Sequence, residues 1–330
     1  MPAGLSLDPH TGVITGTPTT PPLTASVTTR HTVTAIGSTE DRATATLTIT
    51  VNPATGVDGQ VRAIAVANDG TTYLGGSFAH VGPMAGGLVP ITTSTGTVLA
   101  RPAVAGEVRA AAPDGAGGWY VGGNFSAVGR APMKNLAHLF PDGGLDTAWS
   151  PAVDGVVCSL AVSDGTVYAG GSFNKVGDTT RLQLAAIDSA GDPTAWAPNP
   201  NGEVCAIAVS GDAVHVGGAF TMVGTVPRNH LAAIDSTGKA ASWAPDTNGY
   251  VYALALSGTT VYAGGDFTTA GGQPRGYLAA VGVDGALSSW SPQAIGYVNT
   301  LTVSGTTVFA GGDLIAVDLE PAAGFARIPR

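Results

Sequence analysis

The chain has 330 residues, of which 44% are hydrophobic and only 11% charged, and it carries a formal net charge of −9 at pH 7. Its three lysines, Lys134, Lys175 and Lys239, leave no basic stripe to neutralise a phosphate backbone, so nucleic acid is not expected as a partner. No apolar run approaches the roughly 20 residues that a spanning helix needs, and membrane insertion is not expected either. The 48 glycines predict a turn-rich strand protein rather than a helical one.

Residues 1–52 carry two motifs and a strand pattern of their own. Pro2-Ala3-Gly4-Leu5-Ser6-Leu7 is followed by Thr11-Gly12-Val13-Ile14-Thr15-Gly16-Thr17-Pro18, and the segment ends in the alternating stretch Ala43 to Val51. It resembles the immunoglobulin-like (cadherin-like) modules of bacterial surface proteins. The resemblance implies a partial immunoglobulin-like β-sandwich, because the opening strands of such a module should precede Pro2, and an extracellular or cell-surface location. The first six residues are not those of a signal peptide.

From residue 58 onward the chain repeats itself about every 47 residues. A pair of glycines marks each copy, at residues 75–76, 122–123, 170–171, 217–218, 264–265 and 311–312. The copies span 58–105, 106–154, 155–201, 202–248, 249–295 and the incomplete 296–330. Such a period is typical of solenoids, arrays and propellers.

Turn residues cut each copy into four short β runs. In the clearest copy these are Val251 to Leu256, Thr260 to Gly264, Tyr277 to Val283 and Ala286 to Trp290. Four antiparallel strands per copy, with no helical period between them, are typical of a propeller blade. We therefore expect an all-β fold: a six-bladed β-propeller of four-stranded antiparallel blades over 58–330, after the immunoglobulin-like part.

The sequence motif that recurs in each copy fits this expectation. The pattern (V/I)YxGGxF…LAAID…WxP resembles the bacterial delta-sixty-type β-propeller repeat, which is itself similar to kelch repeats. Copy one departs from it with Ala100-Arg101-Pro102 in place of Trp-x-Pro, and copy six has Leu314 for Phe and ends before a fourth strand. The stretch from Thr46 to Asn52 is one candidate for a strand that closes the ring.

Each glycine pair is expected to permit a β-bulge or a close approach from the next blade, rather than to cradle a phosphate, because no helix follows it. The phenylalanines after the pairs and the tryptophans of the WxP motif are interpreted as a repeated packing device, with an aromatic recognition cage as the alternative. They are Phe78, Phe125, Phe173, Phe220 and Phe267, and Trp149, Trp196, Trp243 and Trp290.

No catalytic or metal-binding motif stands out. The six histidines have no metal-ligand spacing, and no GxSxG, HExxH or Walker sequence is present. Asp8 beside a turn glycine, and Asp188 and Asp235 before Gly191 and Gly238, are interpreted as turn formers rather than calcium or acid/base residues. No cofactor or metal is therefore predicted.

Two sets of recurring residues leave alternatives open. Arg181, Arg228 and Arg275 precede the third strand, where pairing with a carboxylate such as Asp266 or with carbonyls is favoured over ligand contact. Cys158 and Cys205 occupy the same position in consecutive copies, and two free thiols are favoured over a disulfide.

The informative positions are those that vary while the scaffold repeats. Two residues flank the fixed valine that begins the first strand of each copy, and a propeller would gather them around one mouth of its channel. They are Gln60 and Arg62, Glu107 and Arg109, Val156 and Cys158, Glu203 and Cys205, Tyr250 and Tyr252, and Tyr297 and Asn299. Their aromatic and polar composition is typical of a polar-ligand, glycan or protein site, with an ordinary solvated rim as the alternative.

We therefore expect a non-catalytic binding or display propeller on an exported bacterial protein. A propeller enzyme of oxidase, lyase or glycosidase type and a purely structural spacer remain the alternatives.

Overall fold

A computed structural model of the chain describes residues 103–322 and 324–330 in full and, before residue 103, the backbone of strands. Those earlier strands are β1 (Leu5–Leu7), β2 (Ile14–Gly16), β3 (Val27–Ile36), β4 (Arg42–Val51), β5 (Gln60–Val66), β6 (Thr71–Ser77), β7 (His80–Val81), β8 (Met84–Ala85) and β9 (Leu88–Thr92). Every described element is a β-strand, and no described helix could span a membrane.

The chain divides into two compact units, one comprising Met1–Gln60 with Phe78–Ala85 and the other Val61–Ser77 with Gly86–Arg330. In the first unit β1 pairs with β2, and β3 pairs antiparallel with β4. The stretch 46–52, a candidate closing strand, falls in β4 up to Val51 and is paired with β3 there.

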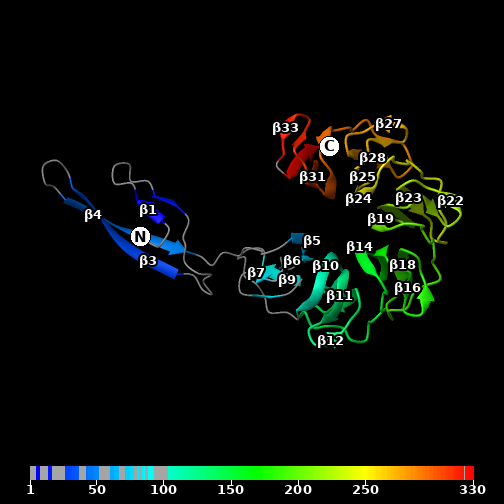
Figure 1. Ribbon diagram of the computed structural model, residues 1–330, viewed down its shortest axis with the longest axis horizontal. Coiled ribbons are helices and arrows are strands. Elements are labelled where there is room, and N and C mark those ends of the chain that lie inside the picture. The colour runs from blue at the N-terminus through cyan, green and yellow to red at the C-terminus, as the bar shows by residue number, and fades with distance from the viewer. Residues whose placement is uncertain are drawn as a thin grey trace. The chain divides into compact units, whose positions relative to one another are not determined.

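The second unit consists of one antiparallel sheet repeated (Figure 1). In each copy the first strand pairs with the second, and the second pairs with the third. The sheets are β5-β6-β9, β10 (Val104–Pro113) with β11 (Trp119–Val128) and β13 (Leu136–Leu139), β14 (Val156–Ser163) with β15 (Thr166–Ser172) and β18 (Leu184–Ile187), β19 (Val204–Ser210) with β20 (Ala213–Gly218) and β23 (Leu231–Ile234), β24 (Val251–Ser257) with β25 (Thr260–Gly265) and β28 (Leu278–Gly282), and β30 (Val298–Ser304) with β31 (Thr307–Gly312) and β34 (Phe325–Pro329).

Small two-residue strands lie beside these sheets, most of them between the second and third strands, whereas the one over Ala294–Ile295 comes before β30 and pairs with the one over Ala316–Val317. They are β12 (Ala131–Pro132), β16 (Lys175–Val176), β17 (Thr179–Thr180), β21 (Met222–Val223), β22 (Val226–Pro227), β26 (Thr269–Ala270), β27 (Gln273–Pro274), β29 (Ala294–Ile295), β32 (Ala316–Val317) and β33 (Glu320–Pro321).

In copies two to five, where the structure describes the segment, the expected fourth strand is not formed as a strand. The segment expected at Ala286 to Trp290 makes one isolated bridge, Val281↔Leu287, and then leaves the ladder. The same happens at Leu139↔Leu145, Ile187↔Pro193 and Ile234↔Ala240. The tryptophan that ends each of these segments joins two sheets through its indole.

Each of these tryptophans binds the sheet that follows its own. The indole Nε1 of Trp149 donates to the Asp188 carbonyl at 3.0 Å, and the indole of Trp243 donates to the Gly282 carbonyl at 2.7 Å. Trp149 also packs on Tyr120 of its own sheet, with ring centroids 4.8 Å apart. The tryptophans therefore hold neighbouring sheets together, as the packing interpretation predicted.

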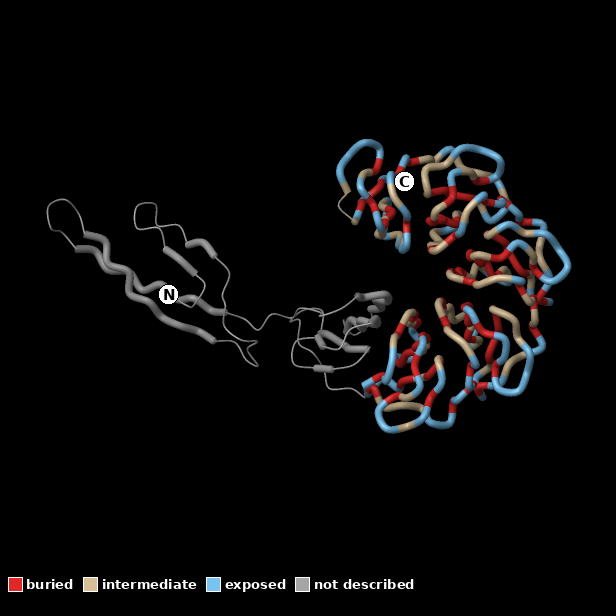
Figure 2. The backbone as a smooth tube through the Cα atoms, viewed as in Figure 1, coloured by how far each residue is buried: buried red, intermediate tan, exposed pale blue. Residues whose placement is uncertain are grey.

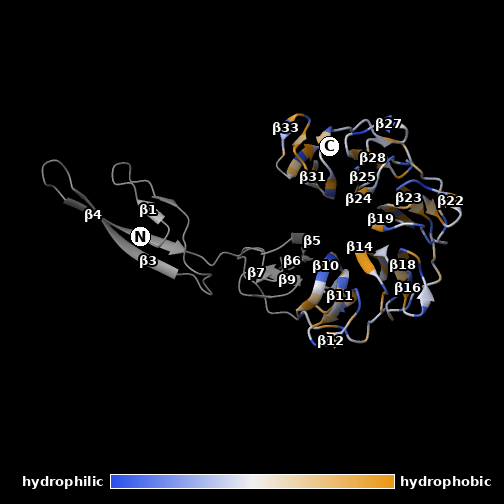
Figure 3. Ribbon diagram, viewed as in Figure 1, coloured by the Kyte–Doolittle hydropathy of each residue, from blue (hydrophilic) through white to orange (hydrophobic). Residues whose placement is uncertain are grey.

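The core lies between sheets rather than beneath a single one. Figure 2 shows buried residues along the described strands and exposed residues at the loops, and Figure 3 shows the hydrophobic residues concentrated in the same strands. Phe173, Phe220 and Phe267 are fully buried, so these rings are packing residues and not a recognition cage. Burial of such side chains contributes about 1.5–3 kcal/mol each.

The two glycines of each pair divide the two roles that the sequence predicted, a close approach of the next sheet and a β-bulge within the same sheet. A Cβ on Gly217 would lie 2.5 Å from Val251 Cγ1 of the next sheet, whereas a Cβ on Gly218 would lie 2.0 Å from the Glu203 carbonyl of its own sheet. Real Cβ atoms do not approach so closely. The first glycine therefore admits the neighbouring sheet's valine, and the second admits the backbone of the first strand.

Candidate functional site

The candidate site lies on the first strands of the repeated sheets. These strands are neighbours, β10 beside β14, β14 beside β19, β19 beside β24 and β24 beside β30, and they line one side of the row of sheets (Figure 1). Each first strand carries a register shift at the same place, where one variable residue is skipped in the pairing with the second strand. The shifted residues are Arg109, Cys158, Cys205, Tyr252 and Asn299.

These positions are β-bulges, in which the extra residue is left out of the ladder and its side chain is re-aimed. The second glycine of each pair makes the bulge possible, because its missing Cβ leaves room for the carbonyl of the other variable residue. That carbonyl belongs to Glu107 opposite Gly123, for example, and to Tyr250 opposite Gly265. A fixed scaffold thus presents a different side chain from every sheet at one equivalent place.

Charged residues occupy the part of the site on β10, β14 and β19. Arg109 Nε donates to Glu107 Oε2 at 3.0 Å, and the Cys158 thiol donates to Glu203 Oε1 at 3.0 Å. Arg109 Nη1 also approaches Cys158 Sγ, at 4.0 Å. Side chains from three sheets are therefore linked in one line of contacts.

Both cysteines are free thiols, as favoured from the sequence. Burial, followed by the hydrogen bond to Glu203, raises the pKa of Cys158 to about 12, although Arg109 acts in the opposite direction. Burial and the charge of Glu203 likewise raise the pKa of Cys205 to about 12. Both side chains are therefore neutral at physiological pH and are poor nucleophiles.

Aromatic residues occupy the part of the site on β24 and before β30. The Tyr252 hydroxyl donates to Asp266 Oδ2 at 2.7 Å, and Asp266 Oδ1 accepts from the Tyr250 amide at 2.5 Å. Burial and then this hydrogen bond to Asp266 raise the pKa of Tyr252, which stays protonated. Tyr250 and Tyr297 are 45% and 49% exposed, so both rings are open to a ligand.

Two further aromatic contacts join neighbouring sheets at this part of the site. The ring of His230 lies 5.3 Å from that of Tyr250, and the ring of Tyr277 lies 5.9 Å from that of Tyr297, both in edge-on geometry. Edge-on pairs of this kind are worth about 0.5–1.5 kcal/mol beyond their buried area. They hold the exposed tyrosines in defined orientations.

Of the residues predicted from the sequence, Glu107, Arg109, Glu203, Tyr250, Tyr252, Tyr297 and Asn299 lie on this series of first strands or directly before them. Gln60 and Arg62 belong to β5, whose side chains lie outside the described residues. Sequence reasoning missed Asp266, Asp313, Gln183, His230 and Tyr277 as members. The signal was present, since the residue after each glycine pair and the residue before each third strand also vary between copies.

Other singled-out residues have structural roles. Arg228 donates to the carbonyls of Pro227 and Ala241, at 2.7 and 2.5 Å, and Arg181 and Arg275 do the same in their copies. The carbonyl alternative was therefore correct. Asp235 Oδ1 accepts from the amides of Thr237 and Lys239, as expected of a hairpin former, and Asp8 lies outside the described residues.

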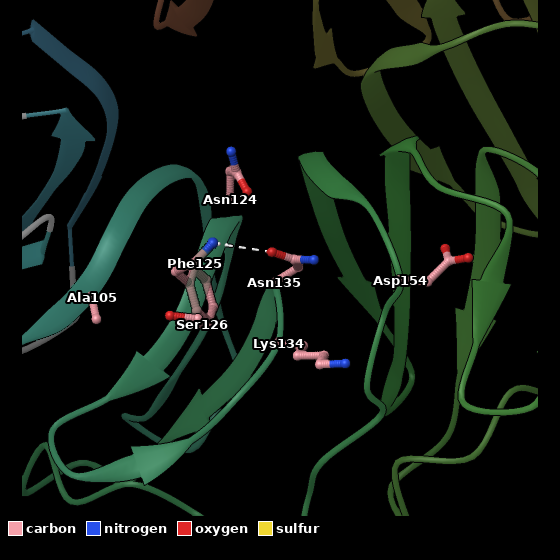
Figure 4. A pocket seen from close by; sticks show the side chains of 7 residues that line it. All are labelled: Ala105, Asn124, Phe125, Ser126, Lys134, Asn135 and Asp154. Atoms are coloured by element: carbon pink, nitrogen blue, oxygen red, sulfur yellow. Dashed lines mark hydrogen bonds between the residues drawn. The ribbon is translucent and has the colours of Figure 1, made fainter.

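A shallow pocket of about 360 Å³ lies beside the charged part, lined by Ala105, Asn124, Phe125, Ser126, Lys134, Asn135 and Asp154 (Figure 4). Its polar groups hold the backbone: Asn135 Oδ1 accepts from the Phe125 amide and Asn135 Nδ2 donates to the Val153 carbonyl, both at 3.0 Å. Within the described residues no cluster of three or more His, Cys, Asp or Glu residues could hold a metal ion.

These features define a repeat protein of antiparallel sheets with a row of variable side chains. The family model He_PIG, an Ig domain, matches residues 1–52, the segment that resembled an immunoglobulin-like module. No curated protein matches the chain.

Solved structures similar to the chain include β-propellers. The designed Ika8 protein shares 15% identity over 83% of this chain and 98% of its own, with a TM-score of 0.45. The WD40 beta propeller domain of Doa1 shares 13% over 82% and 93%, with a TM-score of 0.44. U3-55K shares 12% over 83% and 97%, also with a TM-score of 0.44.

Proposed function

We propose that the chain is a non-catalytic binding module that recognises a neutral glycan at the row of bulged first strands. The observation that carries the proposal is the β-bulge repeated at Arg109, Cys158, Cys205, Tyr252 and Asn299. The scaffold is constant there while the presented side chain changes, which is the design of a recognition surface. Bulges are over-represented next to functional sites for this reason.

The aromatic part supports a sugar ligand. Exposed tyrosine rings offer flat apolar faces with a polar tip, and Tyr250 and Tyr297 are about half exposed. Asn299, on β30, adds a hydrogen-bonding group, and Asp266, directly after β25, orients Tyr250 and Tyr252. A sugar ring, with apolar C–H groups and hydroxyls around its edge, matches this combination.

The charges of the site favour a neutral ligand over an acidic one. Glu107, Glu203, Asp266 and Asp313 are carboxylates, whereas the described part of the site has one guanidinium, Arg109, which is paired with Glu107. The whole chain is also negative, at −9. Phosphate, sulfate and uronic acid groups would be repelled.

We further propose that the six copies close into a six-bladed ring of the delta-sixty, kelch-like type. The first glycines Gly122, Gly170, Gly217 and Gly264 each receive a valine from the next sheet, whereas around Gly311 the nearest described side chain is Thr300. The valine that follows in the cycle of repeats is Val61, at the position of Val108 in copy one. Packing of Val61 against Gly311 would complete the series.

The location proposed for the protein is the bacterial cell surface or its surroundings. It is supported by the Ig-domain match over residues 1–52, since such modules space the parts of exported proteins.

The test is binding of the whole chain to a glycan array that contains neutral, sulfated and uronic-acid members. We expect neutral oligosaccharides to bind and Tyr250→Ala to weaken that binding at least tenfold. Phe140→Ala serves as the matched control, because Phe140 is also exposed, at 43%, but lies after the third strand β13 and away from the first strands. Preference for acidic glycans, or equal effects of both variants, would contradict the proposal. Binding to a protein and to no glycan would replace the ligand class, and no binding to either would favour a spacer.

A further inference from the structure

Among the recurring non-glycine positions with left-handed backbone, one lies next to the candidate site. It is the residue before the third strand, where Gln183, His230 and Tyr277 have φ values of 61°, 65° and 64°. Asn135 occupies the same position with φ 62°. Gln and Tyr rarely adopt this conformation, which is unfavourable for residues with a Cβ, while Asn and His tolerate it better.

The outer copies of the repeat show that no side chain is needed there. The last sheet has Gly324 at this position, with φ 90°, and the first copy has Gly87 before Leu88. The structural role of the position is carried by the main chain: the Gln183 carbonyl accepts from the Gly171 amide at 2.9 Å, and the Gln183 amide donates to the Phe173 carbonyl at 2.9 Å. Glycine would preserve both hydrogen bonds.

Gln183 and His230 carry a second unfavourable feature. Gln183 Oε1 and His230 Nδ1 are buried and have no hydrogen-bond partner in the described part of the chain. Burying a polar atom without a partner destabilises the fold. By contrast, the side chain of Asn135 makes two hydrogen bonds to the backbone, to Phe125 and Val153, and so has a structural purpose.

The His230 side chain contacts a variable residue of the next sheet, and Gln183 occupies the equivalent position in its own copy. The His230 ring contacts Tyr250 across the sheet boundary at 5.3 Å, and Gln183 precedes Glu203 by the same 20 residues in the sequence. Tyr277 and Tyr297 repeat the arrangement in the next pair of sheets, at 5.9 Å. The ring contact is therefore present at two consecutive sheet boundaries, and the same pair of sequence positions recurs at the boundary before them.

From this repetition we infer that Gln183 and His230 are ligand-binding residues, and that the ligand is an oligosaccharide of repeating neutral sugars whose successive units lie at successive sheet boundaries. The inference rests on the proposed glycan-binding function and adds the second row of residues and the linear form of the ligand. The left-handed backbone is retained at these positions because the side chains contact the sugar.

The experiment replaces Gln183 and His230 by glycine, one at a time, in the whole chain. Gln183→Gly removes the backbone strain and the unpartnered atom, so we expect its thermal midpoint to rise by about 2 °C or more. His230→Gly also deletes the ring contact with Tyr250, so we expect its thermal midpoint to stay within about 2 °C of the wild type. Binding of cellohexaose, maltohexaose, mannohexaose or xylohexaose, whichever the wild type binds best, should weaken at least tenfold in Kd. A variant that is more stable and binds less is not expected of a structural residue.

Asn135→Gly is the matched control, since it changes the same backbone position but deletes two hydrogen bonds. It should lower the thermal midpoint and leave Kd within about twofold. A fall in the midpoint of both Gln183→Gly and His230→Gly would overturn the inference, because the side chains would then be structural.

Two results separate this inference from the proposed function. If Tyr250→Ala abolishes binding while Gln183→Gly and His230→Gly retain it, the inference fails and the glycan site stands. If the hexasaccharide binds no better than the trisaccharide of the same sugar, the linear ligand is refuted while the glycan site again stands. Absence of binding to every sugar tested overturns both.

Discussion

Substituting Gly217 tests directly how neighbouring sheets fit together. A Cβ at this position would lie 2.5 Å from Val251 Cγ1 and 2.9 Å from Val251 Cβ, about 1 Å inside the 3.5–4.0 Å at which carbons rest. Val251 is fully buried and its β-branched side chain has few alternative rotamers, so it cannot swing away. The sheets must separate or the valine must strain.

The expected magnitude follows from two opposing effects. Overpacking of this kind costs about 1–3 kcal/mol, while replacing a strand glycine by alanine recovers about 0.5–1 kcal/mol. We therefore expect Gly217→Ala to lower the free energy of unfolding by about 1–2 kcal/mol, which increases the unfolding equilibrium constant by about 5–30-fold.

The assay is guanidinium unfolding followed by tryptophan fluorescence, arranged as a double-mutant cycle with Val251→Ala. Removing both γ carbons of Val251 relieves the 2.5 Å contact, so the double variant should be more stable than the sum of the single effects predicts, by about 1 kcal/mol. Additive effects, within about 0.5 kcal/mol, would refute the claim that this glycine exists to admit the neighbouring valine.

Two further predictions concern titratable side chains. Burial alone would raise the pKa of Asp114 and of Asp146, but hydrogen bonds with His138, at 3.1 and 3.0 Å, and from backbone amides outweigh it and lower both pKa values. The contribution of these two carboxylates to stability is therefore complete above the unfolded carboxyl pKa near about 4 and is lost as pH falls below it. We expect His138→Gln to make the fall in thermal midpoint between pH 6 and pH 2 shallower. Equal falls in the wild type and the variant would contradict this account. With pKa values of about 12, Cys158 and Cys205 should react with iodoacetamide at pH 8 on the order of 10³-fold more slowly than free cysteine. The reaction is followed by mass spectrometry. A rate near that of free cysteine would show that the thiols are not buried as described.

The repeat made much of the scaffold predictable. Glycine at the same two places in every copy pointed to close backbone approach, and the structure divides the two roles between Gly217, which faces the next sheet, and Gly218, which faces its own first strand. The variable residues could be found because they differ where everything around them recurs. Arg109 and Glu203 do lie in one chain of contacts, through Cys158.

Other features depend on information that residue types do not carry. The segment Ala286 to Trp290 has the composition of a strand, but Trp290 donates to the Pro329 carbonyl of the next sheet at 2.7 Å, and the backbone leaves the ladder. The left-handed backbone at Gln183 runs against the preference of its residue type, so only coordinates reveal it. Asp266 was expected beside an arginine, yet its partners are Tyr250 and Tyr252.

Closure of the six copies into one ring is tested most directly by a disulfide between the first copy and the last. Cysteines would be placed at Val61 and Gly311 in a chain whose own two cysteines are replaced by serine, with the pair Gly264→Cys and Val298→Cys as positive control, because a Cβ at Gly264 lies 3.0 Å from Val298 Cβ. We predict that both pairs form an intramolecular disulfide in dilute solution, detected as an oxidised monomer by non-reducing mass spectrometry. Cross-linking of the control pair, with the Val61 and Gly311 cysteines remaining free or joining separate molecules, would contradict the closed ring.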